Sequence, residues 1–261
     1  MSIDPNTRWT TSLSMPEYFN HKLLLGDTTA IQQNTDTIEF TGTDKAELFQ
    51  ENLLKKPEDW WYRTKPISYK LNSNGYRAPE WETIDWNQAV VILGCSMTYG
   101  IGLAEDETIS WYLSEILRRP VINLGVGGSS IPFSCYNSLL VYRNFGMPWA
   151  VINMWTDTNR VPVFTEEGIN HNGPWTMRKD SLMDHWTRSP FNAIAHSRMM
   201  TGLVHDFWKD KSRYWEATFF DHTAEYLNVD RIRFDDRARD DLHIGKFGTL
   251  KTAQIIAKKL G

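Results

Sequence analysis

The feature that most constrains the fold is an uninterrupted apolar run from Ala89 to Leu93, which ends at Gly94. Such a run, without alternation of polar residues, is typical of a strand that is buried on both faces of a parallel sheet. Similar runs at 121–124 and 150–155 predict two further strands, and apolar residues at helical spacing predict helices at about 105–117 and 131–142. Alternating strands and helices with short links favour right-handed crossovers and a doubly wound sheet.

In a doubly wound sheet, ligands bind beyond the carboxyl ends of the strands. Gly94 and the glycines within 125–128 follow two of the predicted strands directly, so these turns are expected at that edge. The sequence therefore predicts a three-layer α/β/α sandwich with a mainly parallel, flavodoxin-like sheet. Two more helices are expected at about 192–209 and 247–260, and the residues between them show little pattern.

The pattern divides the 261-residue chain into an N-terminal extension, 1–86, and an α/β domain, 87–261. The extension is rich in Asn, Thr, Asp and Pro and lacks repeated strands and helices. One hairpin is expected in it, with strands at 67–71 and 76–77 around the turn 72–75. Within the domain, residues 156–190 lack periodicity, and a loop of this length favours a lid or a surface for a partner.

Composition excludes several functions. The net charge of −4, without a cluster of Lys and Arg, argues against nucleic-acid binding. The two cysteines, Cys95 and Cys135, provide neither a disulfide framework nor zinc-ligand spacing, so no metal or cofactor is expected. Neither an apolar run of about 20 residues nor a signal-peptide pattern is present, which favours a cytoplasmic location without a membrane span.

A candidate nucleophile follows the first predicted strand. Residues 94–100 read Gly-Cys-Ser-Met-Thr-Tyr-Gly, which places Ser96 between a buried strand and a helix, with its hydroxyl at the ligand edge. Thr98 stands where the nucleophile elbow of α/β-hydrolases requires glycine. The run instead resembles block I of the SGNH (GDSL-like) hydrolases, Gly-Asp-Ser-x-Thr-x-Gly, with Cys95 in place of the aspartate. The resemblance implies that Ser96 is the nucleophile of a serine esterase with an SGNH-type fold.

A candidate base lies near the other end of the chain, where Asp240 precedes His243 by three residues. A histidine base needs a carboxylate at Nδ1 while Nε2 faces the serine, and a tight loop with this spacing can provide both. The segment resembles the Asp-x-x-His block of the same family, which implies a Ser96, His243 and Asp240 triad. Asp241 is the rival partner, although the spacing favours Asp240. The charged run 235–240 is otherwise typical of a solvated face.

Glycine turns offer backbone amides to a developing oxyanion. The segment from Asn123 to Gly128 resembles block II of the family, and this resemblance assigns Gly128 as one oxyanion donor and the Ser96 amide as another. Gly125 and Gly127 are equally explained by a tight turn.

Block III of the family, Gly-x-Asn-Asp, is missing after the third predicted strand. Alignment by strand end puts Asp157 where the family has its asparagine, and a carboxylate there would repel an oxyanion unless it were protonated. Asn159 could substitute for the asparagine, and Thr156 could donate through its hydroxyl. The loss of one donor costs on the order of 3 kcal/mol in the barrier.

These residues predict an esterase that hydrolyses small acyl esters through an acyl-enzyme. The 12 tryptophans favour acylated carbohydrates, such as O-acetyl esters, with Trp155 and Trp175 as candidate binding residues. A second hypothesis is a binding or structural module that kept the fold with weak or no catalysis, for example a carbohydrate-recognition or virion component. A third hypothesis, a phosphate-binding loop at 94–102, lacks the Gly-Lys-Ser/Thr ending and leaves His243 without a role.

The extension also carries a resemblance of its own. Residues 69–77 are similar to segments that precede the Gly-Cys-Ser block in phage-encoded members of the family. The resemblance implies a virion-associated location as the alternative to a cytoplasmic one, and it makes the extension a candidate contact for a protein partner.

Overall fold

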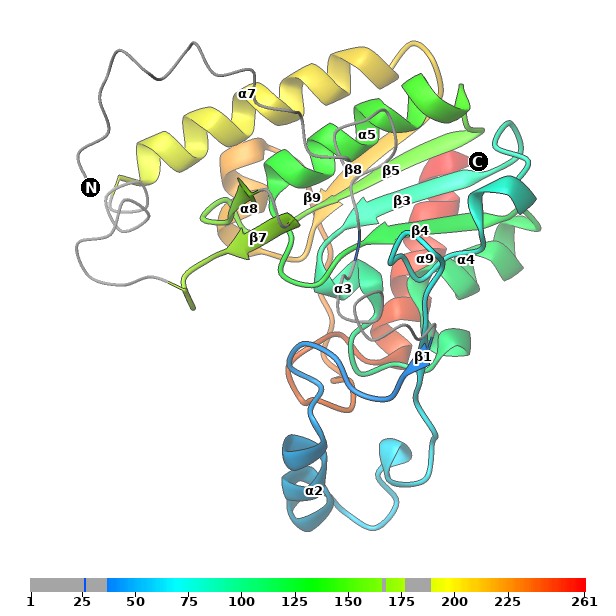
Figure 1. Ribbon diagram of the computed structural model, residues 1–261, viewed down its shortest axis with the longest axis vertical. Coiled ribbons are helices and arrows are strands. Elements are labelled where there is room, and N and C mark those ends of the chain that lie inside the picture. The colour runs from blue at the N-terminus through cyan, green and yellow to red at the C-terminus, as the bar shows by residue number, and fades with distance from the viewer. Residues whose placement is uncertain (1–25, 27–36, 166–167, 177–188) are drawn as a thin grey trace.

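A computed structural model describes residue 26 and residues 37–165, 168–176 and 189–261 (Figure 1). Most of the first 36 residues of the predicted extension lie outside the described residues. So do 166–167 and 177–188 of the predicted lid or partner loop.

Five parallel strands form the central sheet in the order β4-β3-β5-β8-β9. Counted along the chain within this sheet, the order is 2-1-3-4-5, which is the flavodoxin-like arrangement. The predicted fold class is therefore confirmed. The strands are β3 (Val90–Gly94), β4 (Val121–Gly125), β5 (Ala150–Trp155), β8 (Arg213–Thr218) and β9 (Asp230–Arg231).

Helices cover both faces of this sheet (Figure 1). Val91 of β3 packs in the core beneath α5 and α7, whereas its neighbour Val90 packs in the core beneath α4 and α9. Both valines are 0% exposed, which explains why the strand reads as a continuous apolar run. The predicted helices correspond to α4 (Ile109–Leu117), α5 (Ile131–Phe145), α7 (Pro190–Trp208) and α9 (Lys246–Leu260).

Several short elements were not predicted, because they lack a clear apolar period. Strand β8 is one example, because aromatic and charged residues follow one another in it. A helix in the N-terminal segment, before the predicted hairpin, is another. The short elements that were not predicted include α2 (Ala46–Lys55), α8 (Asp221–Leu227), and the 3-10 helices η2 (Trp61–Arg63) and η3 (Trp81–Thr83), whereas α3 (Ser96–Tyr99) and η4 (Glu105–Glu107) lie where helices were expected.

The predicted hairpin at 67–77 is wrong in its pairing. The turn exists, because the Gly75 amide donates to the Asn72 carbonyl at 2.9 Å. Strand β2 (Tyr69–Lys70), however, pairs antiparallel with β1 (Thr37–Ile38) and not with the residues after the turn. One backbone hydrogen bond crosses the turn, from the Asn72 amide to the Tyr76 carbonyl at 2.9 Å, and Tyr76, which is 0% exposed, packs into the core of the sandwich.

Residues before position 87 contribute directly to the packing of the domain. Ile38 and Tyr69 share a hydrophobic cluster with Tyr99, which follows the candidate nucleophile. Trp86 stacks on Phe145 of α5 with ring centroids 3.9 Å apart and an angle of 5° between the planes. The described part of the predicted extension, 37–86, is thus packed against the sandwich on two sides.

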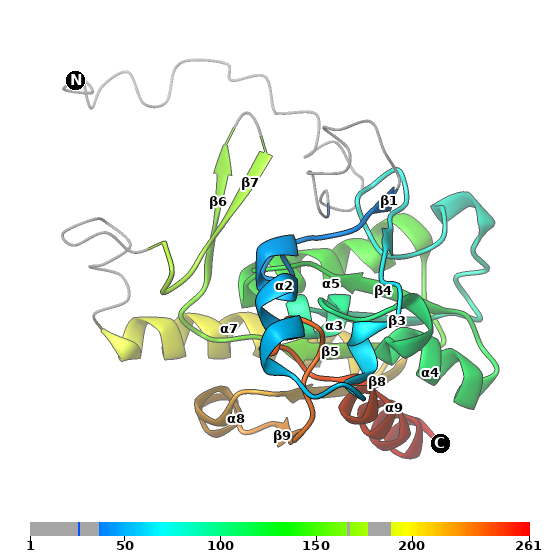
Figure 2. The same cartoon turned by 90° about the horizontal axis from the view of Figure 1, so that it is seen from below.

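The region predicted as an irregular loop, 156–190, contains an antiparallel hairpin of β6 (Val161–Thr165) and β7 (Gly168–Asn172). Figure 2 shows these strands extending away from the central sheet. Whether the region acts as a lid stays a prediction. Within the described ranges, every helix is too short or too polar to span a bilayer.

The charged run 235–240 is solvated only in part, because Asp235 and Arg237 are exposed whereas Arg239 is not. Arg239 is buried, and its Nε and Nη2 donate to the two carboxylate oxygens of Asp44 at 2.9 and 2.6 Å. The two side chains are 5% and 1% exposed. This bidentate ion pair joins the N-terminal segment to the loop before α9.

The substitution Asp44→Asn should lower the free energy of unfolding by about 3 kcal/mol, because it leaves the buried Arg239 cation without its counter-ion. Urea denaturation of the full chain measures this change. Glu115→Gln is the matched control, since Glu115 pairs with Arg118 where the side chains are 53% and 80% exposed. The control should change stability by less than about 1 kcal/mol, and equal effects of the two substitutions would contradict the prediction.

Candidate active site

Ser96 is the first residue of α3, directly beyond the end of β3. A Cβ atom at Gly94 would lie 2.2 Å from Thr98 Oγ1 and 2.9 Å from the Met154 carbonyl oxygen, so only glycine fits. The close approach of Thr98 to Gly94 explains the glycine and threonine of the motif, because the two residues allow α3 to pack tightly against the strand ends. As a first-turn amide, the Ser96 N–H has no acceptor within its own helix.

Ser96, His243 and Asp240 form one hydrogen-bonded chain. His243 Nε2 lies 2.7 Å from Ser96 Oγ, and His243 Nδ1 lies 2.6 Å from Asp240 Oδ2. The three residues are 7%, 8% and 1% exposed, so the chain is largely shielded from water. The structure thus brings together residues that the two distant sequence blocks predicted as partners.

The loop that carries the acid and the base is held by backbone hydrogen bonds. Asp240 Oδ1 accepts from the amides of Leu242 and His243 at 3.1 and 3.0 Å. Asp241 adopts a left-handed conformation, with φ of 59°, and its carboxylate pairs with Lys56 Nζ at 2.5 Å. Of the two rival aspartates, the structure therefore places Asp240 on the histidine and Asp241 on a lysine.

A residue that sequence reasoning missed completes this arrangement. Thr43 Oγ1 donates to Asp240 Oδ2 at 2.6 Å and lies 3.4 Å from His243 Nδ1. Burial alone would raise the pKa of Asp240, but the hydrogen bonds from His243 and Thr43 and the charge of His243 outweigh it, and the pKa is lowered. No signal in the sequence distinguishes Thr43 from the other threonines of the N-terminal segment.

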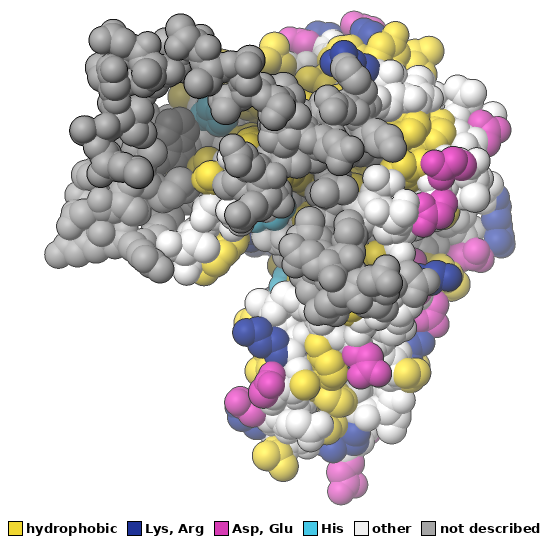
Figure 3. Space-filling model, viewed as in Figure 1, with side chains coloured by type: hydrophobic (Ala, Val, Ile, Leu, Met, Phe, Trp, Pro, Cys, Tyr) yellow, Lys and Arg dark blue, Asp and Glu magenta, His cyan; other side chains and the backbone are white. Residues whose placement is uncertain are grey.

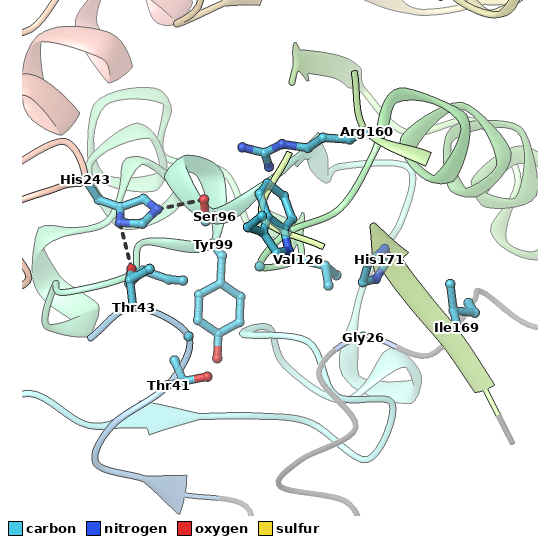
Figure 4. A pocket seen from close by; sticks show the side chains of 15 residues that line it. Gly26, Thr41, Thr43, Ser96, Tyr99, Val126, Arg160, Ile169, His171 and His243 are labelled. Carbon is cyan, nitrogen blue, oxygen red and sulfur yellow. Dashed lines mark hydrogen bonds between the residues drawn. The ribbon is translucent and has the colours of Figure 1, made fainter. Parts of the chain in front are cut away.

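A cavity of about 620 Å³ opens in front of Ser96 and His243 (Figure 4). The N-terminal segment lines one side through Thr41 and its neighbours, and residues at and after β7 line the other side through His171 and Trp175. The cavity is therefore built from strand ends of the sheet and from segments on both sides of it. Its volume suits a small-molecule ligand.

The segment that resembles block II lies beside the nucleophile. Asn123 Nδ2 donates to the Thr98 carbonyl at 2.9 Å, and its Oδ1 accepts from the Gly125 amide at 2.9 Å, which links the two turns. Gly128 and Gly127 line the cavity, whereas Gly125 does not. Gly128 has a φ of +73°, a conformation that L residues with a side chain rarely adopt.

The three candidates after β5 do not line the cavity. Asp157 Oδ1 accepts from the Asn159 amide at 2.8 Å and lies 3.2 Å from His222 Nε2. Thr156 is 1% exposed, and its hydroxyl has no hydrogen-bond partner among the described residues. Arg160, which follows the last of these candidates, Asn159, does line the cavity. Sequence reasoning missed it, because the comparison with block III considered only neutral donors to the oxyanion and the contacts of Arg160 are distant in sequence.

Of the two candidate tryptophans, only one borders the cavity. Trp175 lines it and is 57% exposed. Trp155 is 1% exposed at the end of β5, and its Nε1 donates to Glu216 Oε2 at 2.7 Å, so it belongs to the core. Among the described residues, no group of three or more His, Cys, Asp or Glu side chains is placed to hold a metal ion.

No protein-family model and no curated protein matches the sequence. Solved structures do resemble it. The esterase EstA of Pseudoalteromonas is 12% identical with a TM-score of 0.41, covering 66% of this chain and 96% of that one. A member of the lipolytic G-D-S-L family from Veillonella parvula is 11% identical with a TM-score of 0.38, covering 65% and 96%.

An acetyl xylan esterase from Butyrivibrio proteoclasticus is 7% identical with a TM-score of 0.43, covering 68% of this chain and 64% of that one. At such low identities and scores, these likenesses do not transfer a function to this chain. The case for function therefore rests on the geometry of Ser96, His243 and Asp240.

The substitution Thr43→Val should raise the pKa of Asp240, because it removes one of the hydrogen bonds that stabilise the carboxylate. NMR titration of the Asp240 carboxyl carbon measures this pKa directly. Thr83→Val, at an exposed threonine of η3, is the matched control and should leave the pKa of Asp240 unchanged. An unchanged pKa in Thr43→Val would show that the Thr43 hydroxyl does not stabilise the carboxylate.

The pKa of Asp240 is lowered in the folded chain, so its charged form stabilises the fold at neutral pH and this contribution is lost as the pH falls through the folded pKa. The variant Asp240→Asn has no charged carboxylate at this position, so it lacks this contribution to the free energy of unfolding. The difference in the free energy of unfolding between the wild type and this variant should therefore be largest above about pH 5 and should narrow toward about pH 3. Urea denaturation at several pH values tests this, and a constant difference would contradict it.

Proposed function

We propose that the protein is a serine esterase of the SGNH hydrolase type, with Ser96 as nucleophile, His243 as base and Asp240 as its partner. The observation that supports it best is the continuous hydrogen-bonded chain of these three residues at the wall of a cavity. A serine whose hydroxyl is bonded to a histidine, which is in turn held by a carboxylate, is the arrangement that activates a hydroxyl for acyl transfer.

In the proposed reaction, Ser96 Oγ attacks the ester carbonyl while His243 Nε2 takes its proton. The Asp240 carboxylate, already bonded to Nδ1, stabilises the imidazolium that results. His243 then donates the proton to the departing alcohol, which leaves an acyl group on Ser96. A water molecule, deprotonated by His243, attacks this acyl group and releases the acid.

The oxyanion of the tetrahedral intermediate would accept hydrogen bonds from the backbone amides of Ser96 and Gly128. Asn159 was the candidate for a third donor, but it does not line the cavity. Two backbone donors are enough for an oxyanion hole, as in the serine proteases. The substrates we propose are small acyl esters, including O-acetyl groups of carbohydrates, for which the Trp175 ring at the cavity offers a stacking surface.

The rival function is a binding or structural module that keeps the fold without efficient catalysis. The loop after β5 favours it, because none of Thr156, Asp157 and Asn159 reaches the cavity. The rival and the esterase differ in one measurable property, the reactivity of the Ser96 hydroxyl.

In the described structure, side chains of both charge signs are interspersed over the visible face, without a large basic area (Figure 3).

A fluorophosphonate probe should label the purified protein at Ser96, because the activated hydroxyl attacks phosphorus as it would attack an ester. Mass spectrometry of the labelled peptide locates the site. Ser96→Ala should abolish labelling and lower the hydrolysis of a small acetyl ester by at least about 10³-fold. Ser110→Ala, at another buried serine near Asn123, is the matched control for folding and labelling. Equal labelling of the wild type and Ser96→Ala, or none in either, would favour the binding module.

A further inference from the structure

Arg160 points into the cavity because of how the loop after β5 turns (Figure 4). The Asp157 carboxylate accepts from the Asn159 amide, and the Asp157 carbonyl accepts from the Arg160 amide at 3.3 Å. Together these bonds close a tight turn of the kind that Asp favours. The turn engages the Asp157 carboxylate and the Asn159 backbone amide, and the side chain that follows it, that of Arg160, points toward Ser96 (Figure 4).

The guanidinium of Arg160 is held in place but has few hydrogen bonds. It lies over the rings of Trp175 and Phe220, 4.9 and 5.6 Å from their centroids. Its one hydrogen bond within the described structure joins Nη1 to the Ser129 carbonyl and is long, at 3.4 Å. Nε is buried without a partner. A guanidinium has five N–H donors, so most of them remain available to a ligand.

Among the described residues, no carboxylate forms an ion pair with Arg160, whose side-chain hydrogen bond goes to the Ser129 carbonyl. None of the described residues that line the cavity is an aspartate or a glutamate. The Asp157 carboxylate accepts from the Asn159 backbone amide and lies beside His222, and the Asp240 carboxylate is bonded to His243. A partly buried cation with unused donors attracts an anion strongly, because a charge-assisted hydrogen bond is about twice as strong as a neutral one.

We infer that Arg160 forms a subsite for a carboxylate, so that the cavity selects acyl esters of acidic compounds. The planar fork of a guanidinium matches a carboxylate in a bidentate geometry, and a single positive charge without an ion-pair partner among the described residues matches a monoanion. Stacking on the half-exposed ring of Trp175 places the guanidinium on the wall that faces a bound substrate. This inference rests on the proposed function and adds the substrate class to it.

A pair of substrates that differ only in charge tests the inference. We choose 3-(4-acetoxyphenyl)propanoate and its neutral methyl amide, because the scissile acetyl ester is the same and the carboxylate is insulated from it. The wild type should hydrolyse the acid with a kcat/KM at least about tenfold higher than that of the amide. Arg160→Gln should reduce this ratio to about one, and Arg160→Lys, which keeps the charge without the fork, should give an intermediate ratio.

Arg118→Gln is the matched control, because Arg118 lies at the end of α4 with a side chain that is 80% exposed and does not line the cavity. It should keep the wild-type ratio. If Arg160→Gln lowers the hydrolysis of both compounds equally and the ratio is unchanged, Arg160 acts on the oxyanion, and the inference of a carboxylate subsite is wrong.

A binding measurement separates this inference from the proposed esterase activity. Calorimetry with Ser96→Ala, which cannot form the acyl-enzyme, should show the acid binding at least about tenfold more tightly than the amide. The double variant with Arg160→Gln should lose this difference. If the wild type hydrolyses neither compound but the binding difference depends on Arg160, the carboxylate subsite stands and the esterase proposal fails. Equal binding of the acid and the amide to Ser96→Ala would overturn the subsite.

Discussion

The buried ion pair between Arg239 and Asp44 is the interaction on which the candidate site depends. It joins positions that are 195 residues apart, and each partner is the immediate neighbour of a residue at the site. Arg239 precedes Asp240, and Asp44 follows Thr43, so the ion pair brings the Thr43 hydroxyl to the Asp240 carboxylate. The Tyr69 hydroxyl donates to the same Asp44 carboxylate and accepts from the Gly102 amide, which extends the contact to the loop beyond the nucleophile turn.

The site therefore combines two kinds of support. Ser96 sits on the end of a buried central strand, where packing on both faces leaves little freedom. His243 sits on a loop, and the N-terminal segment braces this loop through the contacts of Asp44 with Arg239 and of Thr43 with Asp240. Arg77 of that segment donates to the carbonyls of Gly100 and Leu103 at 2.9 and 3.0 Å, so the same segment also fixes the chain after Ser96.

The sequence predicted the parts of the molecule that follow a local pattern. The strands β3, β4 and β5 and the four long helices repeat apolar residues at short range, and Ser96 and the loop of Asp240 and His243 carry compact motifs. Pairing between distant segments leaves no such pattern. The partner of β2 lies about 30 residues upstream of it, and Arg239 is indistinguishable from its solvated neighbours until Asp44 is found beside it. Thr43 and Arg160 were missed for the same reason, since their roles depend on residues that are distant in sequence.

The altered segment after β5 has a different consequence from the one that its sequence suggested. A carboxylate at the position of the family's asparagine would oppose an oxyanion, but Asp157 is engaged by the Asn159 amide and lies beside His222, outside the cavity lining. The charge that this segment presents to the cavity is the positive one of Arg160. The chain thus lacks the asparagine donor, worth on the order of 3 kcal/mol in related sites, without introducing repulsion in its place. In the proposed subsite, this positive charge faces the carboxylate of a substrate rather than the developing oxyanion.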